Sequence, residues 1–174
     1  MAPTIYTIGH SNLSIDRFLE LLDDHGIRLI VDVRSAPYSR FAPHFNRADL
    51  EHALSLHQIE YRYAGDFLGG RPADPELYRE GTIPNERHDF LQAVNYEKVA
   101  QTPAFRRGLD RLIELAESST VAVLCSEENP RECHRHFLIE QNLEESATML
   151  HIRTSKGDVR IERLLETEVQ HRLL

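Results

Sequence analysis

The sequence is poor in several residue types, and each shortage excludes a class of protein. It has no tryptophan, only two cysteines and only two methionines in 174 residues. Two cysteines are too few for the disulfide framework of a small secreted protein. No apolar run approaches the roughly 20 residues that cross a bilayer, and the residues after Met1 lack the charged and apolar regions of a secretory signal. We therefore expect a cytoplasmic protein without a membrane partner.

Basic residues are also in the minority. Twenty lysines and arginines against 28 aspartates and glutamates give a formal net charge of -8. Sequence-independent binding of nucleic acid needs a broad basic surface, which this composition argues against. With 41% hydrophobic residues the chain is long enough for one core and too short for two comfortable domains. We predict a single α/β domain over residues 1–174.

The hydrophobic periodicity predicts alternating strands and helices. Strands are expected at 5–8, 29–33, 59–63, 120–124 and 149–152, and helices at about 15–25, 46–57, 89–100, 103–117 and from 130 onward. This order predicts three layers, in which a mostly parallel sheet of about five strands carries helices on both faces. The tail from about Arg160 has an amphipathic helical pattern. It would dock on the core or pair with a partner subunit in an oligomer.

One segment fits no regular element. Residues 65–87 hold four of the eight glycines and three of the eight prolines. A long irregular segment in a small domain is more often a functional flap than a plain connection. A surface excursion without any role would have the same composition. We expect the segment to cover the site, with Gly69 and Gly70 among the residues that contact the substrate.

Three polar clusters each follow an apolar strand. His10 follows the first, Asp32 and Arg34 end the second, and Cys125 with Glu127 ends the fourth. In an open parallel sheet all strand-to-helix loops emerge at one edge, so these clusters are expected to meet in a shared site. The plainer alternatives are a structural ion pair between Asp32 and Arg34 and ordinary loop hydrogen bonding at His10.

These residues also carry a family resemblance. The chain resembles domain of unknown function family 488 from about Tyr6 to about Ile152, in motifs that recur in the same order: Thr7-Ile8-Gly9-His10-Ser11, Asp32-Val33-Arg34 with Pro37 and Ser39, Leu68-Gly69-Gly70, Leu124-Cys125-Ser126-Glu127 and Cys133-His134-Arg135. The family has no settled activity. The resemblance therefore implies a common site at the matched positions and supplies no reaction.

A first chemistry for this site is thiol chemistry. Cys125 precedes Asn129-Pro130, a good helix start, and a helix N-terminus lowers a thiol pKa. The spacing from Cys125 to Arg131 matches the bare pattern of cysteine phosphatases, but neighbouring glutamates would repel a phosphate and Pro130 lacks an N–H. We discount that match, yet still expect Cys125 to be more reactive than Cys133.

A second chemistry is metal binding, for which the main candidate ligands are Cys125, Cys133 and His134, with Glu127 and His10 as further donors. Their spacing is not a standard zinc pattern. On a helix with ~3.6 residues per turn, consecutive residues point about 100° apart, so one metal would not easily take both Cys133 and His134. The plain alternative for Cys133 is a small buried residue on the face of Phe137. We assign no metal and name no cofactor.

A third chemistry is the binding of an anion by arginine. Arg34 and Arg135, with Arg71 as a further candidate, could hold a phosphate or carboxylate, while His10 or His134 acts as general acid or base. Aromatic residues near these positions in sequence, such as Tyr38, Phe45 and Tyr61, could hold a planar group. The sequence thus favours an enzyme for a small anionic or nucleotide-like substrate, with catalytic residues Cys125, His10, Glu127 and His134 and substrate-binding residues Asp32, Arg34, Ser39, Gly69, Gly70 and Arg135.

The alternative function is a binding module without turnover. The same pocket would then recognise a ligand or a nucleic-acid fragment. The two functions differ in what they require of the cysteines. An enzyme of this kind needs a reactive thiol in a closed cleft, whereas a module is compatible with two inert thiols and an open cleft.

Overall fold

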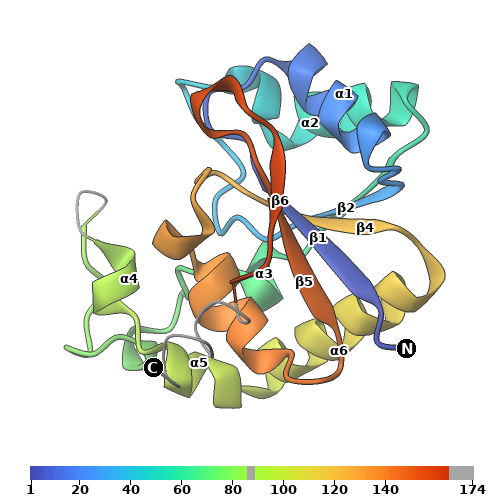
Figure 1. Cartoon of the computed structure of the whole chain (residues 1–174). Coiled ribbons are helices and arrows are strands. Elements are labelled where there is room, and N and C mark those ends of the chain that lie inside the picture. The colour runs from blue at the N-terminus through green and yellow to red at the C-terminus, as the bar shows by residue number, and fades with distance from the viewer. Residues whose placement is uncertain (86–88, 165–174) are drawn as a thin grey trace.

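A six-stranded sheet with the order β3-β2-β4-β1-β5-β6 forms the centre of the computed structural model (Figure 1). The structure describes residues 1–85 and 89–164. The strands are β1 (Thr4–Gly9), β2 (Leu29–Asp32), β3 (Glu60–Tyr63), β4 (Val121–Cys125), β5 (Thr148–Arg153) and β6 (Arg160–Glu162). The α-helices are α1 (Ile15–Asp24), α2 (Arg47–Leu56), α3 (Gly65–Leu68), α4 (Phe90–Ala93), α5 (Tyr96–Gln101) and α6 (Pro103–Ser118).

Short helical turns occupy much of the remaining chain. They are η1 (Pro43–Phe45), η2 (Pro75–Leu77), η3 (Pro130–Glu132), η5 (Glu140–Asn142) and η6 (Ser155–Gly157), together with the π-helical turn η4 (Arg135–Ile139). Within the described residues, three of these turns begin with proline at their first position. Proline suits that position because its fixed φ matches a helical start and its missing N–H would be unpaired there anyway.

The five strands from β1 to β5 are parallel to one another, and β6 runs antiparallel to β5. β4 lies between β1 and β2, so the first two strands of the chain are not neighbours. β2 and β4 are buried along their whole length, as expected for apolar strands covered on both faces. The predicted mostly parallel α/β sheet is confirmed, with a sixth strand added at one edge.

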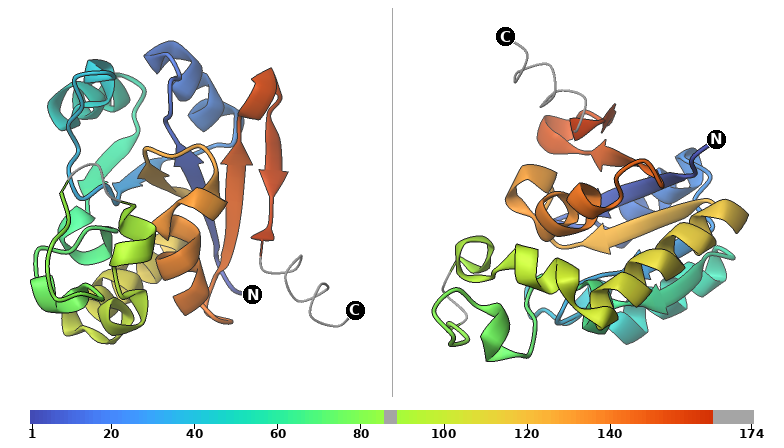
Figure 2. Two further views of the ribbon diagram at one scale, coloured as in Figure 1. Left: turned by 90° about the vertical axis from the view of Figure 1, so that its left-hand side faces the viewer. Right: turned by 90° about the horizontal axis from the view of Figure 1, so that it is seen from below.

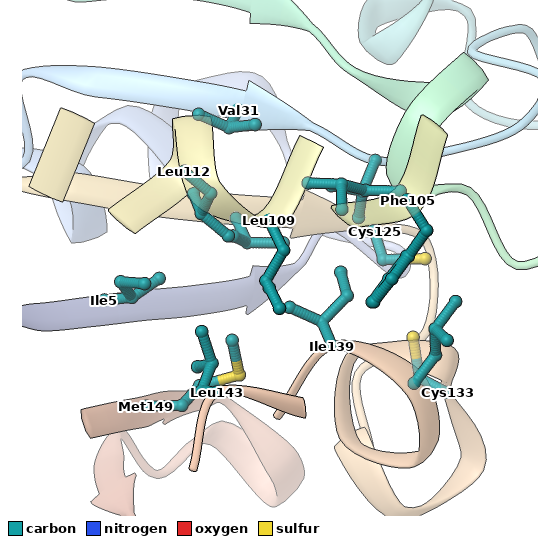
Figure 3. Packing of buried hydrophobic residues seen from close by; sticks show 14 of the residues in the cluster. Ile5, Val31, Phe105, Leu109, Leu112, Cys125, Cys133, Ile139, Leu143 and Met149 are labelled. Atoms are coloured by element: carbon teal, nitrogen blue, oxygen red, sulfur yellow. The ribbon is translucent and has the colours of Figure 1, made fainter. Parts of the chain in front are cut away.

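Helices cover both faces of the sheet (Figures 1 and 2). α1 and α2 cover one face, where Phe18 and Leu54 pack near Ile30 in one buried cluster. α5 and α6 cover the other face, where Leu109 lies in the same buried cluster as Val31. Figure 3 shows that Cys125 and Cys133 lie at one end of this second cluster, beside Phe105. The site is therefore built on the margin of a packed core.

Three expected helices differ in the structure: those at 89–100, from 130 onward and from about Arg160. The helix predicted for 89–100 is divided into α4 and α5, because Val94 is extended and bridges Tyr78. Asn95 then caps α5 by accepting a hydrogen bond from the Lys98 backbone N–H. Tertiary pairing with the preceding segment has overridden the local helical pattern, which is a common reason for such errors.

The predicted helical tail is wrong in its first part. Arg160–Glu162 form β6, which pairs with β5 and covers what would otherwise be an open edge. Lys156 and Gly157 have φ values of 58° and 79° and make the turn between the two strands. Glu162 pairs with Arg153 on β5, which fixes the hairpin. The remainder of that expected helix, including Val169, lies outside the described residues.

The segment expected to form a flap is anchored to the body of the protein. Leu68 and Tyr78 are buried, and the Tyr78 hydroxyl donates to the Pro72 carbonyl. The Tyr96 hydroxyl of α5 donates to the Gly70 carbonyl. The last residues of this segment, 86 and 87, lie outside the described residues.

Candidate functional site

The ends of β1, β2 and β4 meet at the carboxyl edge of the sheet. Gly9 is paired with Cys125, and the His10 backbone N–H donates to the Cys125 carbonyl at 3.0 Å. A Cβ on Gly9 would lie 1.6 Å from the Glu127 carbonyl oxygen, so the loop after β4 crosses directly over a position that only glycine can occupy. The expected meeting of these three strand ends is confirmed, while the roles of the side chains stay predictions.

Asp32 and Arg34 form a closed ion pair in this edge. Asp32 is fully buried and accepts hydrogen bonds from Arg34 Nε at 2.9 Å and Nη2 at 2.7 Å. It also accepts from the Arg34 backbone N–H and from the Tyr61 hydroxyl. With four donors around its two oxygens, this carboxylate is saturated. The placement matches the structural ion pair that the sequence left open as the plainer alternative.

His10 lies against this ion pair and is neutral. Its Nδ1 contacts the Ser11 carbonyl at 3.0 Å, and its Nε2 lies 3.4 Å from Arg34 Nη1. The ring stacks on Phe45 with centroids 4.4 Å apart. Burial lowers the pKa of His10 to about 4, and the charge of Arg34 acts in the same direction. A neutral ring with a proton on Nδ1 accepts from Arg34 through Nε2, which satisfies both nitrogens.

Cys125, Cys133 and His134 form a second cluster at the same edge. Their ligand atoms all lie within 4.8 Å of one another, and all three side chains are buried. His134 Nδ1 lies 3.9 Å from Cys125 Sγ and 3.8 Å from Cys133 Sγ. The other ring nitrogen, Nε2, is buried and has no hydrogen-bond partner among the described residues. These three side chains are the main metal candidates that the sequence offers, and the further candidates Glu127 and His10 are not part of the group.

The backbone between η3 and η4 brings these side chains together. Cys133 is extended, with φ of -142° and ψ of 146°, and its N–H donates to the Pro130 carbonyl. The expected continuous helix from Asn129-Pro130 is therefore wrong, because a short turn ends before Cys133 and a new one begins after His134. The objection that helical geometry separates Cys133 from His134 fails with it.

Arg135 is fully buried and holds this region together. Its Nε donates to Cys133 Sγ at 3.2 Å and its Nη1 to Thr7 Oγ1 at 3.2 Å. Its Nη2 donates to the carbonyls of Glu127 and Glu128. No carboxylate among the described residues accepts from Arg135, so the Cys133 sulfur is the acceptor that can balance this buried charge. Four of its five N–H donors are thus engaged within the protein, and the substrate contact that the sequence predicted for Arg135 stays a prediction.

The two thiols differ in their acidity. Burial alone raises the pKa of Cys133, but the hydrogen bond from Cys125 and the charge of Arg135 bring it well below its ordinary value. The same hydrogen bond, followed by burial, raises the pKa of Cys125. The order of acidity is thus opposite to the order of reactivity that the sequence predicts, and the relative reactivity of the two thiols stays a prediction. The helix N-terminus on which that expectation rested is only a three-residue turn.

The two glutamates after Cys125 have different surroundings. Glu128 accepts hydrogen bonds from Arg153 at 2.9 and 3.1 Å and from the Thr154 N–H. Glu127 is exposed on one side, and within the described residues its carboxylate accepts no hydrogen bond. Partial burial, followed by the neighbouring Cys133, raises the pKa of Glu127. Glu127 is therefore the uncommitted acid of the pair.

The remaining predicted site residues, Gly69, Gly70 and Ser39, lie at different distances from the cysteine cluster. Gly70 lies against the His134 ring, since a Cβ there would be 2.6 Å from His134 Cγ. Gly69 lies against the Ser35 hydroxyl. Ser39 is in the loop after β2, where its hydroxyl accepts from the Phe41 N–H and makes no hydrogen bond to the cysteine cluster in the described chain. The expected approach of the 65–87 segment to this edge is confirmed at Gly70.

A buried polar chain behind Arg135 was missed by the sequence reasoning. Thr7 Oγ1 lies 2.7 Å from His151 Nδ1, and His151 Nε2 lies 3.1 Å from Glu140 Oε2. The same Glu140 oxygen lies 2.6 Å from His136 Nδ1. The signal in the sequence was a histidine inside the apolar run of β5, because a polar residue there must find a partner.

Two cavities of the described chain lie away from the cysteine cluster. One of about 270 Å³ is lined by residues between Glu140 and Met149 and by Arg163. Another of about 310 Å³ is lined by residues of α1, η1 and α2, including His44. Neither is lined by Cys125, Cys133 or His134.

Comparison with known proteins supports the resemblance. The family model described as Domain of unknown function DUF488 matches residues 14–142, which is more than half of the chain. The chain belongs to the DUF488 family. The match begins after His10 and includes Asp32, Cys125 and His134. No curated protein and no solved structure matches the DUF488 chain. Among the described residues, every helix of this DUF488 protein is too short or too polar to span a bilayer.

Proposed function

We propose that this DUF488 protein is an enzyme that converts a small anionic or nucleotide-like substrate at the carboxyl edge of its sheet. The observation that carries the proposal is the convergence of Cys125, Cys133 and His134 within 4.8 Å, next to the uncommitted carboxylate of Glu127. Thiols, imidazole and carboxylate are the groups that perform nucleophilic and acid–base chemistry. Buried polar atoms without partners, such as His134 Nε2, cost stability and are concentrated at functional sites.

The residues of the edge then take two kinds of role. Cys125, Cys133 and His134 form the reacting centre, and Glu127 moves the proton. His10, Asp32 and Arg34 form the wall of the site, because their hydrogen bonds are already made within the protein. Arg135 supports the centre from behind by donating to the Cys133 sulfur.

An anionic substrate is supported by Arg71, which follows Gly70 at the site. Its backbone N–H donates to the Ser35 hydroxyl, and its guanidinium lies 4.2 Å above the Phe90 ring. Arg71 is exposed and forms no ion pair with the described residues, so its charge is available to a phosphate or carboxylate. Tyr38 and Phe41 are 72% and 91% exposed in the loop after β2 and offer flat surfaces to a planar base.

The test is conversion of a substrate panel by the full chain. Nucleoside mono- and diphosphates, sugar phosphates and small carboxylates are incubated with the protein, and products are separated by chromatography. We expect turnover of at least one compound, a loss of roughly 100-fold or more in kcat for Glu127→Gln, and a raised KM for Arg71→Ala. Glu132→Gln, a nearby exposed acid, is the matched control.

Binding and catalysis are separated by measuring thermal stabilisation with the same panel. A compound that raises the melting temperature and is recovered unchanged from every variant would establish the binding module and overturn the enzyme. Absence of both stabilisation and conversion across the panel would count against an anionic substrate altogether.

A further inference from the structure

The spacing of the donor atoms in the cysteine cluster is that of a metal site. With Zn–S of about 2.3 Å and Zn–N of about 2.0 Å, neighbouring donors around tetrahedral zinc lie ~3.6 to ~3.8 Å apart. His134 Nδ1 lies 3.8 Å from Cys133 Sγ and 3.9 Å from Cys125 Sγ. All the ligand atoms of the cluster lie within 4.8 Å of one another, so one ion could reach the three together with small adjustments.

The orientation of His134 is the second, independent observation. Its side chain is only 7% exposed, and its sole polar contacts in the described chain are from Nδ1 to the two sulfurs. A single N–H can point at one acceptor, yet Nδ1 is almost equidistant from both. A lone pair on Nδ1 directed at an ion between the sulfurs accounts for this placement, and the buried ring has no other polar anchor, since Nε2 is unpartnered.

The surroundings hold these ligands in place before any ion arrives. Cys125 is fixed by its register with Gly9, and Gly70 packs against the His134 ring. The Arg135 backbone N–H and Nε both donate to Cys133 Sγ, as outer hydrogen bonds to a metal-bound thiolate do. A preformed site of this kind loses little conformational entropy when it binds a metal.

We propose that Cys125, Cys133 and His134 bind one zinc ion. Two sulfurs and one imidazole are ligands that zinc accepts and that magnesium and calcium do not prefer. Within the described residues the cluster offers three protein ligands and no fourth. Three protein ligands with one open position are typical of a catalytic zinc site, whereas structural sites have four.

The open coordination position indicates the class of reaction. This inference rests on the proposed function as an enzyme. Zinc lowers the pKa of a bound water to about 7. Glu127 takes a proton from that water. The water oxygen then forms a bond to an electrophilic carbon or phosphorus of the substrate. The bond to the leaving group then breaks, and Glu127 returns the proton to that group. The overall reaction is a hydrolysis that consumes one water and needs no oxidant or reductant.

Metal binding is tested on the full chain after removal of bound metal with a chelator. Zinc is titrated in competition with a chromophoric chelator, and cobalt(II) is added in a parallel experiment. We expect one zinc per chain and, with cobalt, tetrahedral bands together with sulfur-to-metal charge transfer. Cys125→Ser, Cys133→Ser and His134→Gln should each lower zinc affinity by at least about 100-fold, beyond the 10- to 100-fold typical of outer residues.

His52→Gln, an exposed histidine far from the cluster in sequence, should bind zinc as the wild type does. The cobalt spectrum of the wild type keeps the test valid if a variant fails to fold. Substoichiometric zinc binding by the wild type, or a cobalt complex without sulfur charge transfer, would overturn the proposal. Zinc binding without turnover would support the zinc site and contradict the proposed enzyme. Turnover by metal-free protein would support the enzyme and contradict a role of zinc in its reaction.

Discussion

The two halves of the candidate site lie on one sheet edge and differ in how their polar atoms are satisfied. Around Asp32, four donors surround one carboxylate, and both nitrogens of His10 have partners. Around Cys133, the imidazole of His134 leaves Nε2 unpartnered and the Glu127 carboxylate accepts no hydrogen bond within the described chain. One half is a finished network and the other is open.

This difference separates support from chemistry. A fully satisfied buried network rigidifies its surroundings and contributes to a single native structure. Unsatisfied groups lower stability, and proteins retain them where they perform a function. The difference between the two halves of the site therefore predicts that substitutions around Asp32 act chiefly on folding. Substitutions around Cys133 are expected to act chiefly on ligand or metal binding.

The largest effect is expected on breaking the Asp32–Arg34 pair. Asp32→Asn leaves the buried Arg34 charge without a counter-ion and turns an amide donor toward existing donors. We expect the free energy of unfolding to fall by about 3–5 kcal/mol in urea titration. Glu60→Gln breaks an exposed ion pair with Arg62 within β3, the strand next to β2, and should cost less than about 1 kcal/mol. Similar losses of unfolding free energy in both variants would show that the Asp32–Arg34 pair has no special structural role.

A smaller loss is expected for Arg135→Lys. Lysine keeps the charge but cannot reach the sulfur, the Thr7 hydroxyl and two carbonyls at once. We expect stability to fall by about 2–3 kcal/mol, because at least two buried acceptors lose their donors. In metal-free protein the alkylation of Cys133 should also shift to higher pH, since Arg135 helps to hold the pKa of this thiol down. An unchanged alkylation profile would show that Arg135 serves packing alone.

The sheet and the meeting of its strand ends could be predicted from local pattern. Leu29–Asp32 and Val121–Cys125 are apolar runs without competing signals, and parallel strands place their ends at one edge whatever the details of packing. The shared position of His10, Arg34 and Cys125 at one edge of the sheet could therefore be predicted without knowledge of their contacts.

The inner geometry of the site could not be predicted, because tertiary contacts decide it. The extended backbone of Cys133 follows from the turn at Pro130 and from the contacts of Arg135, whose complete burial is rare for arginine and leaves no periodic signal. β6 is likewise three residues long and is held by the pairing of Glu162 with Arg153 and Arg131. Helical periodicity in that stretch was a weaker constraint than an open sheet edge.

Gly70 offers a way to disturb the open half without changing a ligand. In Gly70→Ala the new Cβ would meet the His134 ring at 2.6 Å and push the imidazole from its place. We expect zinc affinity to fall by roughly 10- to 100-fold, or about 1–3 kcal/mol, as for other residues that orient a ligand. Gly81→Ala strains the same segment at a φ of +68° but meets no atom within 4 Å, so it should bind zinc as the wild type does. Equal losses in both would trace the effect to the segment as a whole.

The smallest effect is expected from the pH dependence contributed by His10. In the folded protein burial lowers its pKa to about 4, against 6.5 for an ordinary histidine. The unfolded chain therefore binds the proton first as pH falls, so the stability due to neutral His10 is complete above the unfolded pKa and declines toward about pH 4. Between pH 7 and pH 6 this amounts to less than about 1 kcal/mol.

Urea titrations of the wild type and of His10→Gln at both pH values isolate this contribution. Other groups with lowered pKa values, such as Glu128 and His151, are present in both proteins and cancel in the difference. Glutamine cannot take up a proton, so the variant should lose less stability than the wild type as pH falls. Direct observation of the ring by NMR supplies a second check, because His10 should show no titration between pH 8 and about pH 5.5. A ring that titrates near 6.5 would mean that His10 exchanges with solvent in its charged form, and the closed half of the edge would then have to include a proton acceptor for the reaction.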